Sequence, residues 1–330
     1  MTLKKIVVVF IICSSVLTVF GQSELQIQNI GNFITTSNDT IKECKIGYRT
    51  LGNLNEDKNN VVFMPTWHMG TSEDNLDYLT SIIDANGLYV IVVDALGNGV
   101  SSSPSNYSNF PNISIRDMVN SHYELLMNHL KIEHVELLIG VSMGGMQAFE
   151  WMVAYPEYMN KLIAINGTTK ASFYDKALWN TIVTLIEDAG NDKESMEYAM
   201  NRVADIQLLM STSPSYVSRT YEDENFEEFK AKRYNRKSTP FNQLAHSKAI
   251  LEHNIYKNSN VSLENLVELV KAKILIIIAE QDHVVNPIYS KELSKVLDCD
   301  ILELKGDCGH VAAFCDVALV KQAVSDFLKK

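Results

Sequence analysis

The sequence has no excess of positive charge and no motif for metal binding. Its 29 Lys and Arg residues are outnumbered by 40 Asp and Glu residues, which gives a net charge of −11 at pH 7. An acidic surface repels nucleic-acid phosphates, and no cluster of Lys and Arg offsets this charge. No spacing of Cys and His resembles a zinc site. We therefore expect no nucleic-acid partner and no bound metal.

The longest apolar run is short for a transmembrane helix. Lys4 and Lys5 precede a mainly apolar stretch at residues 6–20, and small residues follow it. A membrane-spanning helix needs about 20 apolar residues, whereas these features are typical of a secretory signal peptide. We therefore expect residues 1–21 to be a signal peptide of an exported (periplasmic or secreted) protein, without stable membrane insertion after cleavage. An uncleaved N-terminal anchor is the main alternative.

Few cysteines would remain after such a cleavage, and the sequence leaves their pairing open. They are Cys44, Cys299, Cys308 and Cys315. Export permits disulfides, but four cysteines allow three connectivities. Cys308 and Cys315 lie on either side of a loop histidine, His310, which suggests a link. Free buried cysteines fit the pattern equally well.

Short apolar runs alternate with amphipathic helical patterns along most of the chain. Runs that are apolar on consecutive residues are typical of strands buried on both faces, and their alternation with helices predicts a mostly parallel sheet. Its strands are expected at residues 61–64, 89–93, 135–139, 162–165, 274–279 and 301–304. Two earlier strands are expected at residues 25–32 and 40–50. The helices of this part are expected at residues 115–130, 145–154 and 317–328.

The alternation is interrupted between residues 170 and 260, where only helical patterns occur. Helices are expected there at residues 177–188, 194–210, 225–234 and 241–253. We therefore predict an α/β fold whose doubly wound core comprises residues 22–169 and 261–330, with a helical lid at residues 170–260. A lid near the carboxyl ends of the strands could roof a substrate pocket.

A Gly-x-Ser-x-Gly motif stands at residues 140–144, between an expected strand and an expected helix. In this context the serine lies on a sharp strand-to-helix turn with its hydroxyl exposed, and side chains at Gly140 and Gly144 would collide with neighbouring backbone. The helix N-terminus offers unpaired N–H groups for a developing negative charge. Ser142 is therefore the candidate nucleophile, and the backbone N–H of Met143 is one candidate oxyanion donor.

An acid and a histidine follow in the order expected for such a nucleophile. Asp282 lies just beyond the fifth strand of the expected parallel sheet, whereas its rival Glu280 lies closer to the strand and fits a structural role better. His310 follows the last strand in a loop to which Gly309 gives backbone freedom. A neutral imidazole oriented by a carboxylate can take the proton of a serine hydroxyl. We therefore predict a catalytic triad of Ser142, Asp282 and His310.

The second oxyanion donor is expected in the loop after the first strand of the parallel sheet. We assign the backbone N–H of Trp67, with that of His68 as the alternative. This assignment rests on position, because a backbone donor depends little on its side chain. We assign surface, packing or pocket-wall roles to the other histidines, which are His122, His129, His134, His246, His253 and His283.

Several segments resemble the homoserine O-acetyltransferase family and its hydrolase-like relatives, within the α/β-hydrolase superfamily. They are residues 47–55, 94–105, 115–119 and 142–148, the last of which is specific to this branch. The resemblance runs from about Gly47 to the C-terminus and is weakest in the expected lid. It implies the α/β-hydrolase fold, acylation of Ser142, a triad completed by Asp282 and His310, and compatibility with a homodimer.

Three departures from the family pattern favour its hydrolase-like members. Residues 66–70 differ from the typical His-Ala-Leu-Thr-Gly, and Val311 stands where Asp typically follows the catalytic histidine. No match to the family's Arg-rich substrate-binding motif is evident at residues 172–260. The expected export adds a physical argument, because an exported enzyme would lack acetyl-CoA, a cytosolic metabolite.

The sequence thus predicts a serine hydrolase that cleaves a small ester through an acyl-enzyme and needs no cofactor. An O-acyltransferase that carries an acetyl group from acetyl-CoA, as co-substrate, to an alcohol is the second hypothesis. A non-catalytic binding protein on the same fold is the third, since fold alone does not establish activity.

Overall fold

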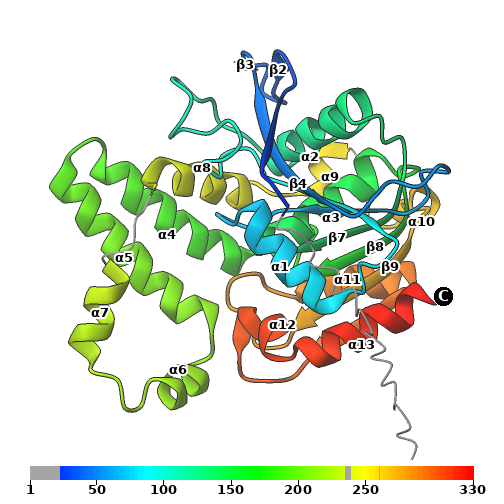
Figure 1. The fold of residues 1–330 in the computed structure, drawn as a ribbon. Helices are drawn as coiled ribbons and strands as arrows, with labels where there is room; N and C mark the ends of the chain where they lie inside the picture. The colour runs from blue at the N-terminus through cyan, green and yellow to red at the C-terminus, as the bar shows by residue number, and fades with distance from the viewer. Residues whose placement is uncertain (1–22, 235–238, 260) are drawn as a thin grey trace, which may run out of the picture.

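A computed structural model describes residues 23–234, 239–259 and 261–330, so the predicted signal peptide lies outside the described residues. An eight-stranded sheet forms the centre of the described chain, in the order β1-β4-β6-β5-β7-β8-β9-β10 (Figure 1). β1 and β4 pair antiparallel with each other and β4 pairs antiparallel with β6, whereas the remaining pairs are parallel. The strands are β1 (Gln26–Asn29), β4 (Lys45–Leu51), β5 (Val61–Pro65), β6 (Tyr89–Val93), β7 (Val135–Val141), β8 (Met159–Ile165), β9 (Lys273–Ala279) and β10 (Asp300–Leu304).

The six strands predicted for the parallel sheet are all present, each extended by up to three residues. In β5 to β9 the Val, Ile and Leu side chains are buried because helices cover both faces of the sheet. In β10, at the edge of the sheet, Ile301 is exposed, so burial on both faces was wrong for this strand. The single strand expected at residues 40–50 is wrong. The chain forms β3 (Thr40–Ile41), which pairs with β2 (Phe33–Ile34), and then β4. Between them Glu43 has a φ of 51°, a left-handed conformation that interrupts the extended backbone.

Two sets of helices cover the two faces of the sheet. α1 (Ser72–Ile82), α12 (Ala312–Cys315) and α13 (Val317–Leu328) pack on one face, and α2 (Ile115–Tyr123), α3 (Met143–Ala154) and α11 (Ile288–Leu297) pack on the other. The helix expected at residues 115–130 is α2 continued by a π-helical stretch, Glu124–His129. The sequence pattern missed α1 and α11.

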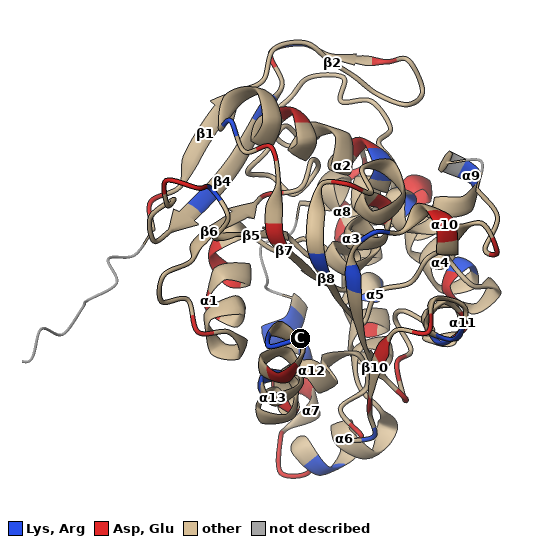
Figure 2. Ribbon diagram, turned by 90° about the vertical axis from the view of Figure 1, so that its right-hand side faces the viewer, with Lys and Arg blue, Asp and Glu red and all other residues tan. Residues whose placement is uncertain are grey.

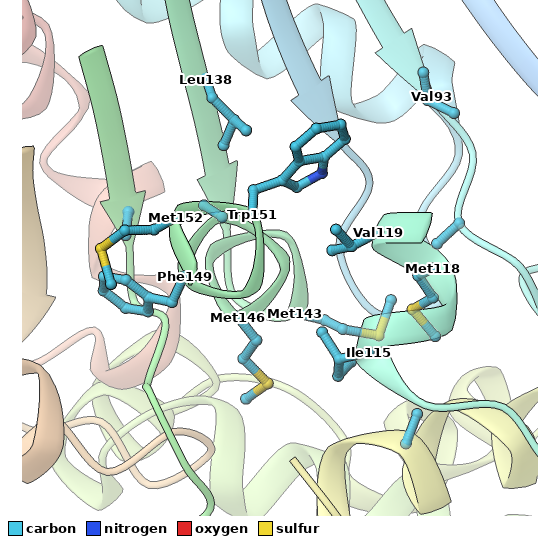
Figure 3. Packing of buried hydrophobic residues seen from close by; sticks show 14 of the residues in the cluster. Val93, Ile115, Met118, Val119, Leu138, Met143, Met146, Phe149, Trp151 and Met152 are labelled. Carbon is cyan, nitrogen blue, oxygen red and sulfur yellow. The ribbon is translucent and has the colours of Figure 1, made fainter. Parts of the chain in front are cut away.

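Helix α3 is buried along nearly all of its length (Figure 3). Trp151 is fully buried, and its ring meets Phe63 of β5 edge-on at 5.4 Å between centroids. Met143 points toward α2, where Ile115 contributes to the same cluster, and Met146 also belongs to this cluster (Figure 3). Because close packing allows such a helix little movement, the turn at its N-terminus is held firmly against the sheet.

A further group of helices follows β8 and precedes β9. They project from the sheet, as the green and yellow ribbons of Figure 1 show, and no strand occurs among the described residues of the insertion. The helices are α4 (Phe173–Ala189), α5 (Lys193–Ser211), α6 (Pro214–Thr220), α7 (Phe226–Tyr234) and α8 (Pro240–Leu251). The short α9 (Ile255–Ser259) and α10 (Leu266–Leu269) lead back to the sheet.

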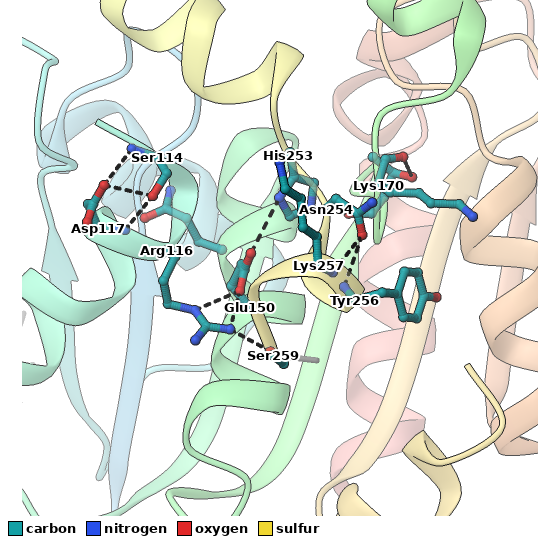
Figure 4. Close-up of polar contacts among 12 residues, drawn as sticks. Ser114, Arg116, Asp117, Glu150, Lys170, His253, Asn254, Tyr256, Lys257 and Ser259 are labelled. Atoms are coloured by element: carbon teal, nitrogen blue, oxygen red, sulfur yellow. Dashed lines mark hydrogen bonds and ion pairs between the residues drawn. The ribbon is translucent and has the colours of Figure 1, made fainter. Parts of the chain in front are cut away.

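A buried ion pair fastens this returning segment to α3 (Figure 4). Glu150 of α3 is fully buried and pairs with Arg116 of α2 at 2.7 Å. Arg116 also donates to Ser259 Oγ at 2.7 Å, and His253 Nδ1 lies 3.8 Å from the Glu150 carboxylate. Since a buried charge that loses its partner is strongly destabilising, these contacts hold α2, α3 and α9 in register.

Acidic and basic residues are interspersed along the ribbon (Figure 2). In residues 23–234, 239–259 and 261–330, no helix has the length and apolar character needed to cross a bilayer. The same residues contain no cluster of three His, Cys, Asp or Glu side chains arranged to hold a metal ion.

Candidate active site

The chain places two loops at the point where the helices change from one face of the sheet to the other. β5 lies between β6 and β7 in the sheet, and α1, which follows β5, packs on the face opposite to α2 and α3. In open α/β sheets, ligands bind at the carboxyl ends of the strands at such a switch point. The loop after β5 and the turn after β7 both lie at this position.

The turn after β7 has the strained geometry expected of a nucleophile elbow. Ser142 has φ 56° and ψ −119°, and its N–H donates to Ile165 O at 2.8 Å. A Cβ atom at Gly140 would lie 2.1 Å from Gly144 O, and one at Gly144 would lie 2.6 Å from Pro65 O. Neither position can hold a larger residue without backbone movement, which explains both glycines of the motif.

The three residues predicted as a triad lie in one hydrogen-bonded line. His310 Nε2 is 2.8 Å from Ser142 Oγ, and His310 Nδ1 is 2.7 Å from Asp282 Oδ2. A carboxylate can only accept, so Nδ1 donates to Asp282 and the hydroxyl of Ser142 donates to Nε2. This tautomer is the one that a general base needs.

The acid of this line is fixed by backbone groups. The second carboxylate oxygen of Asp282 accepts hydrogen bonds from the N–H groups of Val284 and Val285 at 2.8 and 2.9 Å. Its side chain is only 1% exposed. Glu280, the rival acid, is exposed at the end of β9, where its N–H donates to Leu304 O. It is therefore Asp282 that orients His310.

The histidine loop is held by contacts that the sequence did not reveal in advance. Asn166 Nδ2 donates to His310 O at 2.7 Å, and Asn166 N–H donates to Ile277 O. An Asn that directly follows a buried strand, at the same sheet edge as the triad, was the available signal for this role. A disulfide joins Cys308 to Cys315, whereas Cys44 and Cys299 are free.

One of the two predicted oxyanion donors is already engaged. Met143 is the first residue of α3, where backbone N–H groups have no partner within the helix. The N–H of Trp67, by contrast, donates to Asn75 Oδ1 of α1 at 3.3 Å. The loop is in the right place, because Pro65 O packs against Gly144, but the geometry no longer favours the Trp67 amide. The alternative donor, the backbone N–H of His68, stays a prediction.

Comparison with known proteins identifies the family of the chain. A sequence model of the alpha/beta hydrolase fold matches residues 74–316. The chain belongs to the alpha/beta hydrolase fold family. Its relatives include esterases and homoserine O-acetyltransferases, as the sequence resemblance implied.

Three similar proteins illustrate the relationship of this alpha/beta hydrolase to others. The ethyl acetate hydrolase of Pseudomonas veronii is 32% identical over 204 residues, which are 57% of this chain and 58% of that enzyme. The chain therefore matches less than two thirds of this relative's length. A homoserine O-acetyltransferase of Methanosalsum zhilinae is 26% identical over 343 residues, covering 87% of this chain and 69% of the relative. The structure of an acetylester hydrolase from Corynebacterium glutamicum superposes with a TM-score of 0.85 at 21% identity, covering 93% of this chain and 96% of that one.

The hydroxyl of Ser142 opens into a cavity of about 370 Å³ between the core of the alpha/beta hydrolase and the inserted helices. Its walls are mostly apolar or aromatic. They include Trp67, Val141, Trp179, Met210, Val311 and Phe314. Trp179 and Met210 come from the insertion, so α4 and α5 contribute directly to the wall around the serine.

Two histidines beside this cavity, the half-buried His68 and the buried His246, are held neutral. Burial, with further contributions from His246 and His310, keeps the pKa of His68 well below its usual 6.5. Burial also lowers the pKa of His246 to about 4. His246 Nε2 donates to Leu96 O and its Nδ1 accepts from Met69 N–H, which ties α8 to the loop after β5.

Proposed function

We propose that this alpha/beta hydrolase is a serine esterase that hydrolyses a small ester through an acyl-enzyme formed on Ser142. The observation that carries the proposal is the hydrogen-bonded line from Asp282 through His310 to Ser142 Oγ, which ends in a cavity of about 370 Å³. A nucleophile and base in contact, with the base oriented by a third group, are the arrangement that acyl transfer needs.

In the first half of the reaction, Ser142 Oγ attacks the carbonyl carbon of the ester while His310 Nε2 takes the hydroxyl proton. The carbonyl oxygen becomes an oxyanion that the Met143 N–H and a second donor stabilise. Asp282 stabilises the imidazolium without accepting its proton. When the carbon–oxygen bond to the alcohol breaks, His310 donates the proton to the departing oxygen, and the acyl group stays on Ser142.

In the second half, water takes the place of the alcohol. His310 removes a proton from the water as its oxygen bonds to the acyl carbon, and a second oxyanion forms. Collapse of this intermediate releases the carboxylic acid and returns the proton from His310 to Ser142 Oγ. The sum is one ester and one water converted to an acid and an alcohol, with no cofactor required.

Hydrolysis is preferred to acyl transfer because residues 66–70 and Val311 depart from the acetyltransferase pattern. Identity alone does not separate the two activities, since a relative named as an esterase is 32% identical and one named homoserine O-acetyltransferase is 33% identical. Transfer from acetyl-CoA to an alcohol is the alternative, and relatives named homoserine O-acetyltransferase align over 87% of the chain. Export by residues 1–21 and a homodimer are further parts of the proposal. A mature N-terminus near Gln22 would support export.

The first test is intact-protein mass spectrometry after treatment with a fluorophosphonate, combined with turnover of p-nitrophenyl acetate. The wild-type chain is expected to gain one phosphonyl group and to hydrolyse the ester. Ser142→Ala is expected to do neither while unfolding at an unchanged temperature. Ser211→Ala removes another hydroxyl from the wall of the cavity and is expected to retain both properties.

Two results would contradict the proposal. Ester turnover by Ser142→Ala at the wild-type rate would exclude the mechanism. If the wild-type chain shows neither labelling nor turnover, the line of three residues does not activate the serine, and the binding-protein hypothesis takes its place.

A further inference from the structure

The oxyanion that forms at Ser142 needs a second hydrogen-bond donor, and the expected one is occupied. Two donors are usual in this fold, one from the residue after the nucleophile and one from the loop after the strand that becomes β5 here. The Met143 N–H supplies the first. The Trp67 N–H donates to Asn75 Oδ1 at 3.3 Å, so a donor must come from elsewhere in the same loop.

The side chain of His68 is the nearest alternative, because it lines the same cavity as Ser142. His68 follows Trp67 in the loop after β5, and it lines the cavity together with Ser142 and His310. Its ring meets Trp179 of α4 edge-on, with 5.1 Å between the centroids, and lies 5.7 Å from the ring of His246. Rings on two sides therefore restrict its orientation, which is what a preorganised donor requires.

The orientation of the Gln243 amide in the structure assigns the proton of His68 to one of its two nitrogens. Gln243 Nε2 lies 3.0 Å from His68 Nε2 and also donates to Ser247 Oγ at 3.2 Å. The other end of the amide, Gln243 Oε1, accepts from Gln207 Nε2 at 3.4 Å. With the amide in this orientation His68 Nε2 is an acceptor. A neutral imidazole then has its proton on Nδ1.

The surroundings also keep this imidazole neutral. Burial and the proximity of His246 and His310 keep the pKa of His68 well below 6.5. A second cation beside His310 would oppose the imidazolium that forms during catalysis. A neutral N–H avoids this repulsion and still polarises an oxygen, as a neutral histidine does in triosephosphate isomerase.

We propose that the Nδ1–H of His68 is the second oxyanion donor of the site. This inference rests on the proposed esterase function. As Ser142 Oγ bonds to the carbonyl carbon, the carbonyl oxygen gains negative charge and accepts hydrogen bonds from Met143 N–H and His68 Nδ1–H. His68 keeps its proton throughout, and its Nε2 remains an acceptor for Gln243.

The test compares three substitutions of His68 on p-nitrophenyl acetate. His68→Phe keeps a ring but removes the N–H, and is expected to lower kcat about 100-fold, because the loss of one oxyanion donor has this effect. KM is expected to change less than about twofold, since the bond matters in the transition state rather than in the bound ester. His68→Asn can place an amide N–H where Nδ1 was, and is expected to recover kcat to within about 10-fold of wild type. His68→Gln extends its amide toward the Nε2 position and is not expected to recover it.

A matched control and a structural readout accompany these variants. His129→Phe makes the same change at an exposed histidine and is expected to leave kcat unaltered. Fluorophosphonate labelling of His68→Phe is expected to reach completion, although more slowly, because the triad is untouched.

Each outcome bears on either the inference or the proposed function. If wild type hydrolyses the ester, Ser142→Ala does not, and His68→Phe keeps the wild-type kcat, the inference is overturned and the esterase function stands. The His68 backbone N–H, which the substitution leaves in place, would then be the second donor. If Phe, Asn and Gln lower kcat equally and also lower the unfolding temperature, the role of His68 is structural and the inference is wrong. If wild type has no esterase activity, the proposed function fails first and the inference fails with it.

Discussion

Both carboxylate oxygens of Asp282 are used in the structure, one by His310 Nδ1 and the other by the N–H groups of Val284 and Val285. Asp282→Asn is expected to lower kcat about 10⁴-fold, because an amide that donates to Nδ1 selects the wrong imidazole tautomer. Steady-state hydrolysis of p-nitrophenyl acetate measures the loss. Glu280→Gln is the matched control two residues earlier and is expected to retain full activity. Comparable loss in both variants would mean that the acid has been assigned incorrectly.

For single residues, the sequence was sufficient to predict those positions that follow from where the strands end. Ser142, Asp282 and His310 each lie in a loop after an apolar run, and parallel strands bring those loops to one edge of the sheet. The engagement of the Trp67 N–H was not predictable in this way. It depends on Asn75, which belongs to α1, a helix that the pattern had not revealed. The proton position on His68 depends similarly on Gln243 from a distant helix.

At the scale of the elements, a disulfide closes the loop that carries His310. The disulfide joins Cys308 to Cys315 across a sequence separation of 7, and Asn166 holds the loop from β8. Closing a ring of this size removes entropy from the unfolded chain, which amounts to about 2.5 kcal/mol in the chain-entropy relation.

The double variant Cys308→Ala/Cys315→Ala is therefore expected to lower the free energy of unfolding by about 2–3 kcal/mol. It is also expected to lower kcat, because the His310 loop loses one of its two restraints. Urea denaturation and ester turnover measure the two effects. Cys299→Ala, at a free and partly buried cysteine, serves as the control. An unchanged free energy of unfolding in the double variant would show that the bond restrains nothing beyond what packing already fixes.

Elements buried on both faces were predictable, whereas amphipathic and short elements were less so. The parallel strands were found because short apolar runs rich in Val and Ile are more typical of buried strands than of helices at that length. α1 was missed although Thr71 and Asp74 form a capping box at its start, a sequence signal that was available. The break between β3 and β4 was not predictable, because the left-handed Glu43 carries no glycine or asparagine signal.

At the scale of the whole molecule, the cavity exists only because the inserted helices fold back over the sheet. Trp179 of α4 reaches His68 of the loop after β5, residues more than one hundred positions apart in the sequence. The Arg116–Glu150 pair and its contact with Ser259 fasten the returning end of the insertion to α3. Helical periodicity predicts each helix but not which residues meet across the fold. The shape of the substrate pocket is therefore information that the sequence pattern did not contain.

The size of this cavity leads to a prediction about substrates. A volume of about 370 Å³ is near the lower end of the range of about 300–1,000 Å³ that is usual for ligand pockets. The value of kcat/KM is therefore expected to be highest for p-nitrophenyl acetate and butyrate and at least about 10-fold lower for the octanoate, since a longer acyl chain has less room to align its carbonyl with Ser142 in a pocket of this size.

Met210→Ala shortens a side chain in the wall of the cavity that Ser142 also lines, and therefore enlarges the cavity. It is expected to raise kcat/KM for the octanoate relative to the acetate. Met200→Ala is the matched control, because Met200 belongs to the same helix but lines a neighbouring cavity instead. A wild-type profile that is flat from acetate to octanoate would place the acyl chain outside the cavity. A shift of the profile in Met200→Ala but not in Met210→Ala would place it in the neighbouring cavity, on the far side of His68.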